Sequence, residues 1–166
     1  LLQQSKLVTI EYDGVSMEFD KNKYPWVWSP SIDTLLITKR LKDKDLSQYT
    51  SLIEVWSGPW FIAKYLWEKN PKLKNITLTD INPNAKKYFE DNYVNKERFS
   101  FKLGDATDYL DNNKADIVVC NPPYIARPYS IDDNAYEWLY LINYLLRNAS
   151  TFLTDKGKLF INISSL

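Results

Sequence analysis

A strand-like apolar run leads directly into a proline-rich tetrapeptide in the stretch Asp116-Ile117-Val118-Val119-Cys120-Asn121-Pro122-Pro123-Tyr124. The two prolines lack a backbone N–H and have restricted φ angles, so the chain leaves the strand stiff and extended. The Asn121 carboxamide and the Pro122 carbonyl are then placed to accept hydrogen bonds from a planar –NH2 group, and Tyr124 can lie flat beside that group. The stretch therefore predicts a site for an amide or a base amino nitrogen, with a plain strand and proline turn as the alternative.

The rest of the chain alternates strand-like runs with helical patterns. Strands are expected at residues 52–55, 76–79, 99–103, 117–120 and 158–163, and helices at 33–41, 60–69, 83–95, 105–111 and 135–149. This alternation predicts an α/β fold whose doubly wound, mostly parallel sheet is covered on both faces. The Asp13-Gly14 pair between residues 7–12 and 15–19 predicts a β-hairpin. Residues 1–30 are thus expected to form a hairpin and loop, and residues 31–166 the α/β domain.

Composition excludes several kinds of site. Lys plus Arg and Asp plus Glu both number 21, so no net charge favours nucleic acid or an anionic membrane. The sequence has one cysteine, Cys120, and no histidine, which excludes a Cys/His zinc site and histidine-dependent catalysis. A lone cysteine without a signal peptide or membrane span is typical of a cytoplasmic protein, and no metal site is expected.

Polar side chains follow four of the predicted strands: Glu54, Asp80, Asp105 and Asn121. In a doubly wound sheet, ligands bind beyond the carboxyl ends of the strands. An acid after the second strand is suited to accept hydrogen bonds from ribose hydroxyls, and an acid after the third from an adenine amino group. Each acid taken alone is more often a helix cap or a solvated side chain. Their recurrence at successive strand ends favours a nucleotide-type site.

Four blocks carry a family resemblance: Pro-Ser-Ile-Asp-Thr-Leu-Leu at 30–36, Glu54 with its loop, Thr-Asp-Ile-Asn-Pro-Asn-Ala at 79–85, and Asn-Pro-Pro-Tyr at 121–124. In these the chain resembles class I S-adenosylmethionine-dependent methyltransferases of the HemK/PrmC type, which have a Rossmann-like domain. It is most similar to the archaeal and eukaryotic branch that methylates a glutamine in translation release factors. The last block is shared with adenine amino-methyltransferases of DNA and RNA.

The resemblance implies a role for each candidate residue. Asn121 and the Pro122 carbonyl would grip the acceptor –NH2, and Tyr124 would pack on its plane. The implied contacts to S-adenosylmethionine are Asp80 at the ribose, Asp105 with Ala106 at the adenine, Glu54 and the Gly58 backbone at the methionine end, and Asp33 or Thr34 closing over it. Methyl transfer from a sulfonium needs positioning more than an added base, so the absence of histidine is compatible with this chemistry.

The loop after Glu54 departs from the family pattern Gly-x-Gly-x-Gly, because its three positions are Trp56, Gly58 and Trp60. Glycines allow such a loop a tight turn and a close approach to the ligand. Two hypotheses follow. The indoles turn outward and leave an altered pocket, or they fill it and the chain is a catalytically inactive scaffold.

Acceptor and partners are further expectations. A protein glutamine is the favoured acceptor, and an adenine in RNA or DNA is the alternative, which the balanced charge disfavours. The resemblance also implies a small zinc-binding activator subunit. A complete domain of this type has two strands beyond residues 158–163, so the domain at 31–166 is expected to be C-terminally incomplete. Either the chain is a fragment, or its last strand lies at an exposed edge that pairs in a dimer or with a partner. The aromatic residues Tyr24, Trp26 and Trp28 are expected to pack onto the sheet, with a substrate platform as the alternative.

Overall fold

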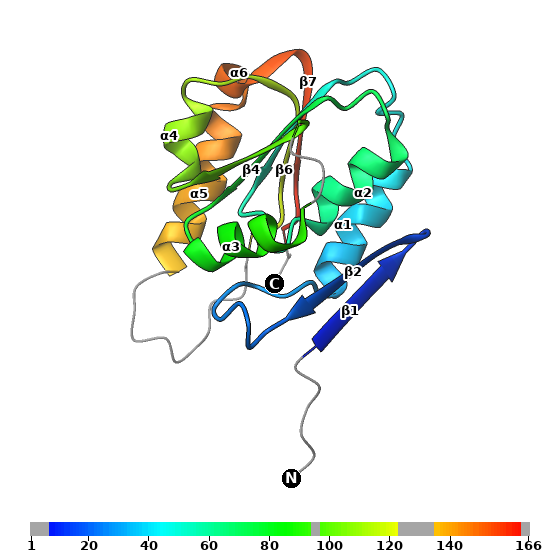
Figure 1. Ribbon diagram of the computed structural model, residues 1–166. Helices are drawn as coiled ribbons and strands as arrows, with labels where there is room; N and C mark the ends of the chain where they lie inside the picture. Colours follow the sequence, from blue (N-terminus) through cyan, green and yellow to red (C-terminus); the bar gives the residue numbers. More distant parts are fainter. Residues whose placement is uncertain (1–6, 94–96, 123–134, 164–166) are drawn as a thin grey trace.

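The computed structural model describes residues 7–93, 97–122 and 135–163 (Figure 1). The elements follow in the order β1 (Leu7–Tyr12), β2 (Val15–Asp20), α1 (Ile32–Lys42), β3 (Ser51–Val55), α2 (Phe61–Lys69), β4 (Asn75–Asp80), α3 (Pro83–Asn92), β5 (Phe99–Leu103), α4 (Ala106–Leu110), β6 (Ala115–Cys120), α5 (Ala135–Arg147), α6 (Ala149–Phe152) and β7 (Leu153–Ile161). Every strand and helix predicted from the alternation is present, and α6 is an additional short helix.

Five strands form one parallel sheet in the order β5-β4-β3-β6-β7, and β1 and β2 form a separate antiparallel hairpin. The predicted α/β class with a mostly parallel sheet is therefore confirmed. Residues of β3 and β6 alternate between two cores, because neighbouring side chains on a strand point to opposite faces. Leu52 and Ile117 pack with α1, α2 and α3, whereas Ile53 and Val118 pack with α4 and α5.

The hairpin packs onto the face that carries α1 and α2 (Figure 1). Its side chains Val15, Met17 and Phe19 are buried in the same core as the sheet. The Asp13 carboxylate at its turn pairs with Lys42 of α1 at 2.8 Å and with Lys69 of α2 at 3.3 Å. Hydrogen bonds from these lysines lower the pKa of Asp13 to about 2. The hairpin is thus joined to the α/β domain by a shared core and by ion pairs.

Strand β7 begins five residues earlier than the predicted 158–163 and ends at Ile161. Its register on β6 shifts between the pair Leu153–Ala115 and the pair Lys158–Ile117. The intervening Thr-Asp-Lys-Gly resembles a turn in sequence, which explains why the start of the strand was missed. In the described sheet, β7 lies at one edge and β5 at the other.

Candidate active site

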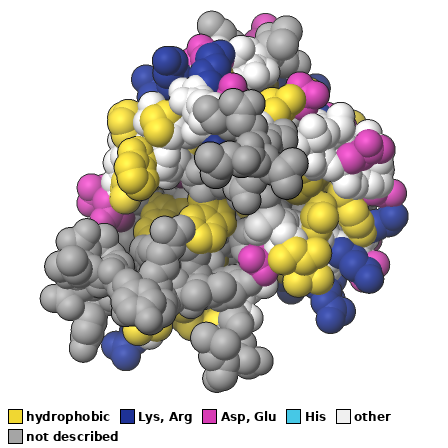
Figure 2. All heavy atoms as spheres, turned by 90° about the horizontal axis from the view of Figure 1, so that it is seen from below, with side chains coloured by type: hydrophobic (Ala, Val, Ile, Leu, Met, Phe, Trp, Pro, Cys, Tyr) yellow, Lys and Arg dark blue, Asp and Glu magenta, His cyan; other side chains and the backbone are white. Residues whose placement is uncertain are grey.

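The candidate site lies where the order of the strands reverses. The chain steps outward from β3 to β4 and β5, then crosses back to β6 on the other side of β3. At such a switch point the loops diverge and leave a crevice beyond the carboxyl ends of the strands. Figure 2 views this end of the molecule and shows hydrophobic side chains on it. A cavity of about 270 Å³ lies at this end, lined by Trp26, Val27, Trp28, Pro30, Thr34, Glu54, Trp56, Ser57, Gly58, Pro59, Phe61, Ile62, Asp80, Ile81, Asn82 and Asn121.

The loop from Trp56 to Trp60 has a left-handed backbone at three alternate positions. The φ angles are +55° at Trp56, +47° at Gly58 and +53° at Trp60. These are the positions at which the resembled pattern has glycine, and a bulky residue at positive φ is uncommon. Two hydrogen bonds hold the turn, from the Ser57 N–H to the Thr79 carbonyl at 2.9 Å and from the Trp60 N–H to the Ser57 carbonyl at 2.6 Å. The loop therefore keeps a glycine-type backbone with two tryptophans in it.

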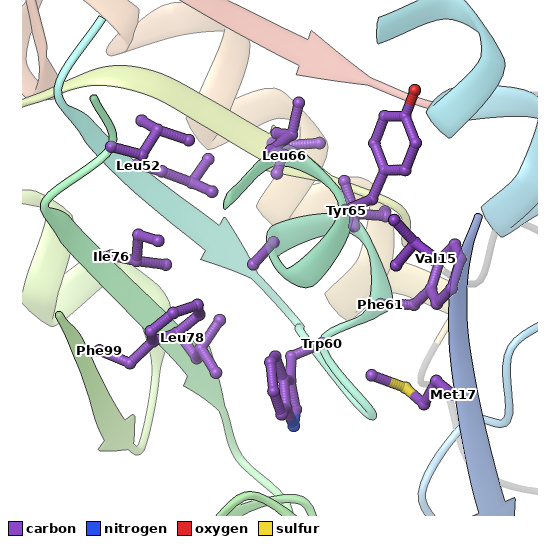
Figure 3. Close-up of a cluster of buried hydrophobic side chains, with 14 of the residues drawn as sticks. Val15, Met17, Leu52, Trp60, Phe61, Tyr65, Leu66, Ile76, Leu78 and Phe99 are labelled. Carbon is purple, nitrogen blue, oxygen red and sulfur yellow. The ribbon is translucent and has the colours of Figure 1, made fainter. Parts of the chain in front are cut away.

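The two indoles lie in different places. Trp60 is 4% exposed and contacts Phe89, Tyr93 and Phe99 edge-on, in the core between the sheet and the hairpin (Figure 3). It does not line the cavity. Trp56 is half-buried, forms part of the cavity wall and packs against the core on the other face of the sheet. The hypothesis that both indoles fill the pocket therefore fails for Trp60, and the cavity stays open beside Trp56.

Gly58 connects the loop to Asp80. Its N–H donates to Asp80 Oδ2 at 2.9 Å, and the Asn82 N–H donates to Oδ1 at 2.9 Å. A Cβ on Gly58 would come within 3.2 Å of the Trp28 carbonyl oxygen, so this position has little room for a side chain. Burial raises the pKa of Asp80, against these backbone hydrogen bonds, which lower it. Each carboxylate oxygen keeps a lone pair for hydroxyls of a ligand.

Glu54 is a buried carboxyl group in the cavity wall, 3% exposed. Its Oε2 accepts a hydrogen bond from the Ala63 N–H in the first turn of α2 at 2.8 Å. Burial raises the pKa of Glu54 to about 8, and the nearby charge of Asp80 adds to this effect. The side chain is thus mostly protonated at neutral pH, and a cation placed in the cavity would favour its ionised form.

Asn121 is held in place by two neighbours. Its Oδ1 accepts a hydrogen bond from Asn162 Nδ2 at 2.9 Å, and its Nδ2 donates to Thr34 Oγ1 at 3.5 Å. Pro122 follows it and is buried. The Asn162 N–H donates to the Cys120 carbonyl at 3.1 Å, which ties the end of β7 to the end of β6.

Asn162 was not among the predicted site residues. Asn162 directly follows β7, and this position points to the site only when β7 is known to pair with β6. Tyr124, the predicted wall beside the acceptor, lies outside the described residues.

Three other predicted residues do not line the cavity. Asp33 is half-buried and accepts a hydrogen bond from Ser31 Oγ at 3.3 Å. Asp105 caps α4 by accepting from the Thr107 N–H at 2.9 Å, and Ala106 is buried in the core. The Gly104 N–H donates to the Asp80 carbonyl at 3.0 Å, so the turn that carries Asp105 lies next to the end of β4.

The aromatic residues before α1 differ in how far they are buried. Tyr24 is buried and packs against Phe19 and Tyr88, as expected. The packing prediction is wrong for Trp26, which is 94% exposed, and holds only in part for Trp28, which is 47% exposed. Both tryptophans line the mouth of the cavity.

Two negative findings apply to the described part of the chain. It contains no group of three or more His, Cys, Asp or Glu side chains that could hold a metal ion. Among its helices, none has the length and apolar character needed to cross a bilayer.

Comparisons with known proteins agree with this geometry. The family model described as "Methyltransferase small domain" matches residues 31–165. A tRNA1(Val) (adenine(37)-N6)-methyltransferase of Actinobacillus pleuropneumoniae is 26% identical over 96 residues, which are 56% of this chain and 40% of that protein.

Among solved structures, Trm5b of Pyrococcus abyssi has a TM-score of 0.60 at 20% identity, over 93% of this chain and 39% of that one. Human N-acetylserotonin methyltransferase, in complex with SAM, has a TM-score of 0.52 at 18% identity, over 78% and 35%. The chain spans less than half the length of these relatives. The structural matches show the same fold, and since the family model extends over most of the sequence, the chain belongs to the methyltransferase small domain family.

Proposed function

We propose that this chain binds S-adenosylmethionine in the cavity and transfers its methyl group to a planar amino nitrogen. The observation that carries the proposal is the position of Asn121, whose carboxamide lies in the cavity wall and is oriented by Asn162 and Thr34. An amide oxygen has two lone pairs, so Oδ1 can accept a second hydrogen bond from an acceptor –NH2. The Pro122 carbonyl would accept the other N–H, and the nitrogen lone pair would then face the cavity.

The residues present fit the cofactor. Ser57 Oγ is a buried hydroxyl without a hydrogen-bond partner in the described part of the chain, and Ser57 lines the cavity. Asp80 would accept from ribose hydroxyls, and Glu54 would accept from the ammonium of the methionine end. The cofactor supplies an electrophilic methyl group on a sulfonium. The protein's contribution is to orient the two reacting groups and to exclude water.

We favour a protein glutamine as the acceptor. This is supported by the blocks at 30–36 and 79–85, which resemble the release-factor branch. A translation release factor is then the proposed substrate, and a small zinc-binding activator subunit the proposed partner. Pairing of the edge strand β7 with a second copy is a separate proposal, for which light scattering at high concentration should detect a dimer.

An adenine amino group in RNA is the second candidate. It is supported by the Actinobacillus relative, whose name states adenine N6 methylation of a tRNA. Glutamine and adenine both offer a planar –NH2, so the arrangement of Asn121 and Pro122 suits both. The balanced charge of the chain favours glutamine, because nucleic-acid enzymes usually have a basic surface.

Methyl transfer from labelled S-adenosylmethionine tests the proposal, with a release factor and an adenine-containing tRNA as acceptors. We expect the unaltered chain to label one of the two acceptors. Asn121→Ala should label that acceptor much less. Calorimetric titration of S-adenosylhomocysteine should give the same affinity for both proteins within a few-fold. Cofactor binding without transfer to either acceptor, with the activator subunit present, would favour the inactive scaffold.

A further inference from the structure

Trp26 has two unusual properties at once. Its side chain is 94% exposed, and its backbone has a φ of +64°. A large aromatic side chain gains nothing from full exposure, and a bulky residue seldom adopts positive φ unless its surroundings require it. The residue also lines the mouth of the cavity. An outlier in this position calls for a functional explanation.

The segment from Tyr24 to Trp28 is fixed across the cavity mouth at several points. Asn84, in the first turn of α3, donates from Nδ2 to the Pro25 carbonyl at 3.0 Å. The buried Tyr24 donates its hydroxyl to Asp91 at 2.8 Å. At the other end, the Trp28 carbonyl lies against Gly58 in the loop after β3. Trp26 is therefore presented to solvent by a well-anchored backbone.

An apolar partner lines the same cavity mouth. Ile81 directly follows Asp80, is 58% exposed and lines the cavity together with Trp26. Asn84, which tethers Pro25, is only three residues beyond Ile81, so the two segments lie close together. If Asp80 holds a ribose, the base attached to that ribose can lie against Ile81, which follows Asp80 and lines the same cavity.

We propose that Trp26 is a cofactor-binding residue whose indole stacks on the adenine ring of S-adenosylmethionine, with Ile81 on the opposite face. The inference rests on the proposed function, because it takes Asp80 as the ribose ligand. Stacking covers an aromatic surface that is otherwise left in water, and every purine offers a flat face for it. The exposed indole of Trp26 is then the surface that the adenine covers.

Calorimetric titration with S-adenosylhomocysteine tests the proposal on the full chain. Trp26→Ala should weaken binding by about tenfold, which is the size of one base–aromatic stack. Trp26→Phe should keep most of the affinity, because it keeps a ring. The control is Leu146→Ala, which removes an exposed side chain near the far end of α5 and should leave binding unchanged.

Trp26→Gly separates the ring from the backbone. Glycine relieves the positive φ, so this variant should melt at a higher temperature and still bind more weakly. Equal affinity of the unaltered chain and Trp26→Ala would overturn the stacking proposal and leave the proposed function intact. If Trp26→Ala instead weakens only the binding of an adenine-containing RNA to the cofactor-saturated protein, the ring belongs to the acceptor and the proposal is wrong. Failure of the unaltered chain to bind S-adenosylhomocysteine would remove the proposed function as well.

Discussion

The free energy of unfolding of the natural chain should decrease as pH rises, and Glu54→Gln should abolish this decrease. In the folded protein burial raises the pKa of Glu54 to about 8, against an ordinary value of 4.5. Below pH 4.5 both the folded and the unfolded chain hold the proton. Between pH 4.5 and 8 the unfolded chain releases it while the folded chain keeps it, so unfolding becomes more favourable with rising pH. Above about pH 8 both states are ionised and the effect is complete.

The size of the effect follows from these two pKa values. At 1.36 kcal/mol per pH unit, the interval from 4.5 to about 8 gives an upper limit of about 5 kcal/mol in the free energy of unfolding. Glutamine does not titrate, and its side-chain oxygen can still accept the hydrogen bond from the Ala63 N–H. The variant therefore keeps the local geometry and loses only the titration.

Urea unfolding at pH 5, 6, 7, 8 and 9 measures the prediction. The stability of Glu54→Gln relative to the natural chain should increase from pH 5 to 8 and then remain constant. Glu68→Gln is the control, because Glu68 lies on α2, the helix whose Ala63 N–H donates to Glu54, but it pairs with Lys64 near the surface and should change the curve little. Parallel curves for Glu54→Gln and the natural chain would refute the assignment of a buried, protonated Glu54.

Four further predictions test the site and its loop. Binding of S-adenosylmethionine should strengthen between pH 6 and 8 and release a proton, because its ammonium group favours ionised Glu54; titrations in buffers of different ionisation enthalpy measure the proton. Gly58→Ala should lower both the melting temperature and cofactor affinity, since its φ is +47° and the new Cβ meets the Trp28 carbonyl, and unchanged values would contradict the close contact. Trp60→Ala should lower the free energy of unfolding in urea by about 3–5 kcal/mol, because it removes a core side chain. Asn162→Ala should lower kcat with little change in cofactor affinity if it positions Asn121, and an unchanged kcat would show that it does not.

Much of the fold could be predicted because the alternation of apolar runs with helical patterns is a local property. The predicted strand at 99–103 matches β5 to the residue. The order of strands could not be obtained in this way, because hydrogen bonding between β3 and β6 joins segments far apart in the chain. The start of β7 was missed because its turn-like sequence is accommodated by a shift in register.

The candidate site was predictable where a residue acts through its position at a strand end. Glu54, Asp80 and Asn121 do meet at one cavity for this reason. Asp105 was predicted by the same reasoning, but its side chain caps α4. The sequence of the loop alone does not show where the two indoles lie. Their positions depend on side chains of α3 and β5 that surround Trp60, and on the core across the sheet that receives Trp56.

The left-handed positions at Trp56, Gly58 and Trp60 have a consequence for how related genes are recognised. A search pattern written in residue types rejects this chain at two of the three loop positions, whereas one written in dihedral angles accepts it at all three. In this loop the left-handed main chain accommodates two large side chains, because the cores on the two faces of the sheet receive them. A genome survey that requires glycine at these positions would miss this chain, although a methyltransferase family model matches it.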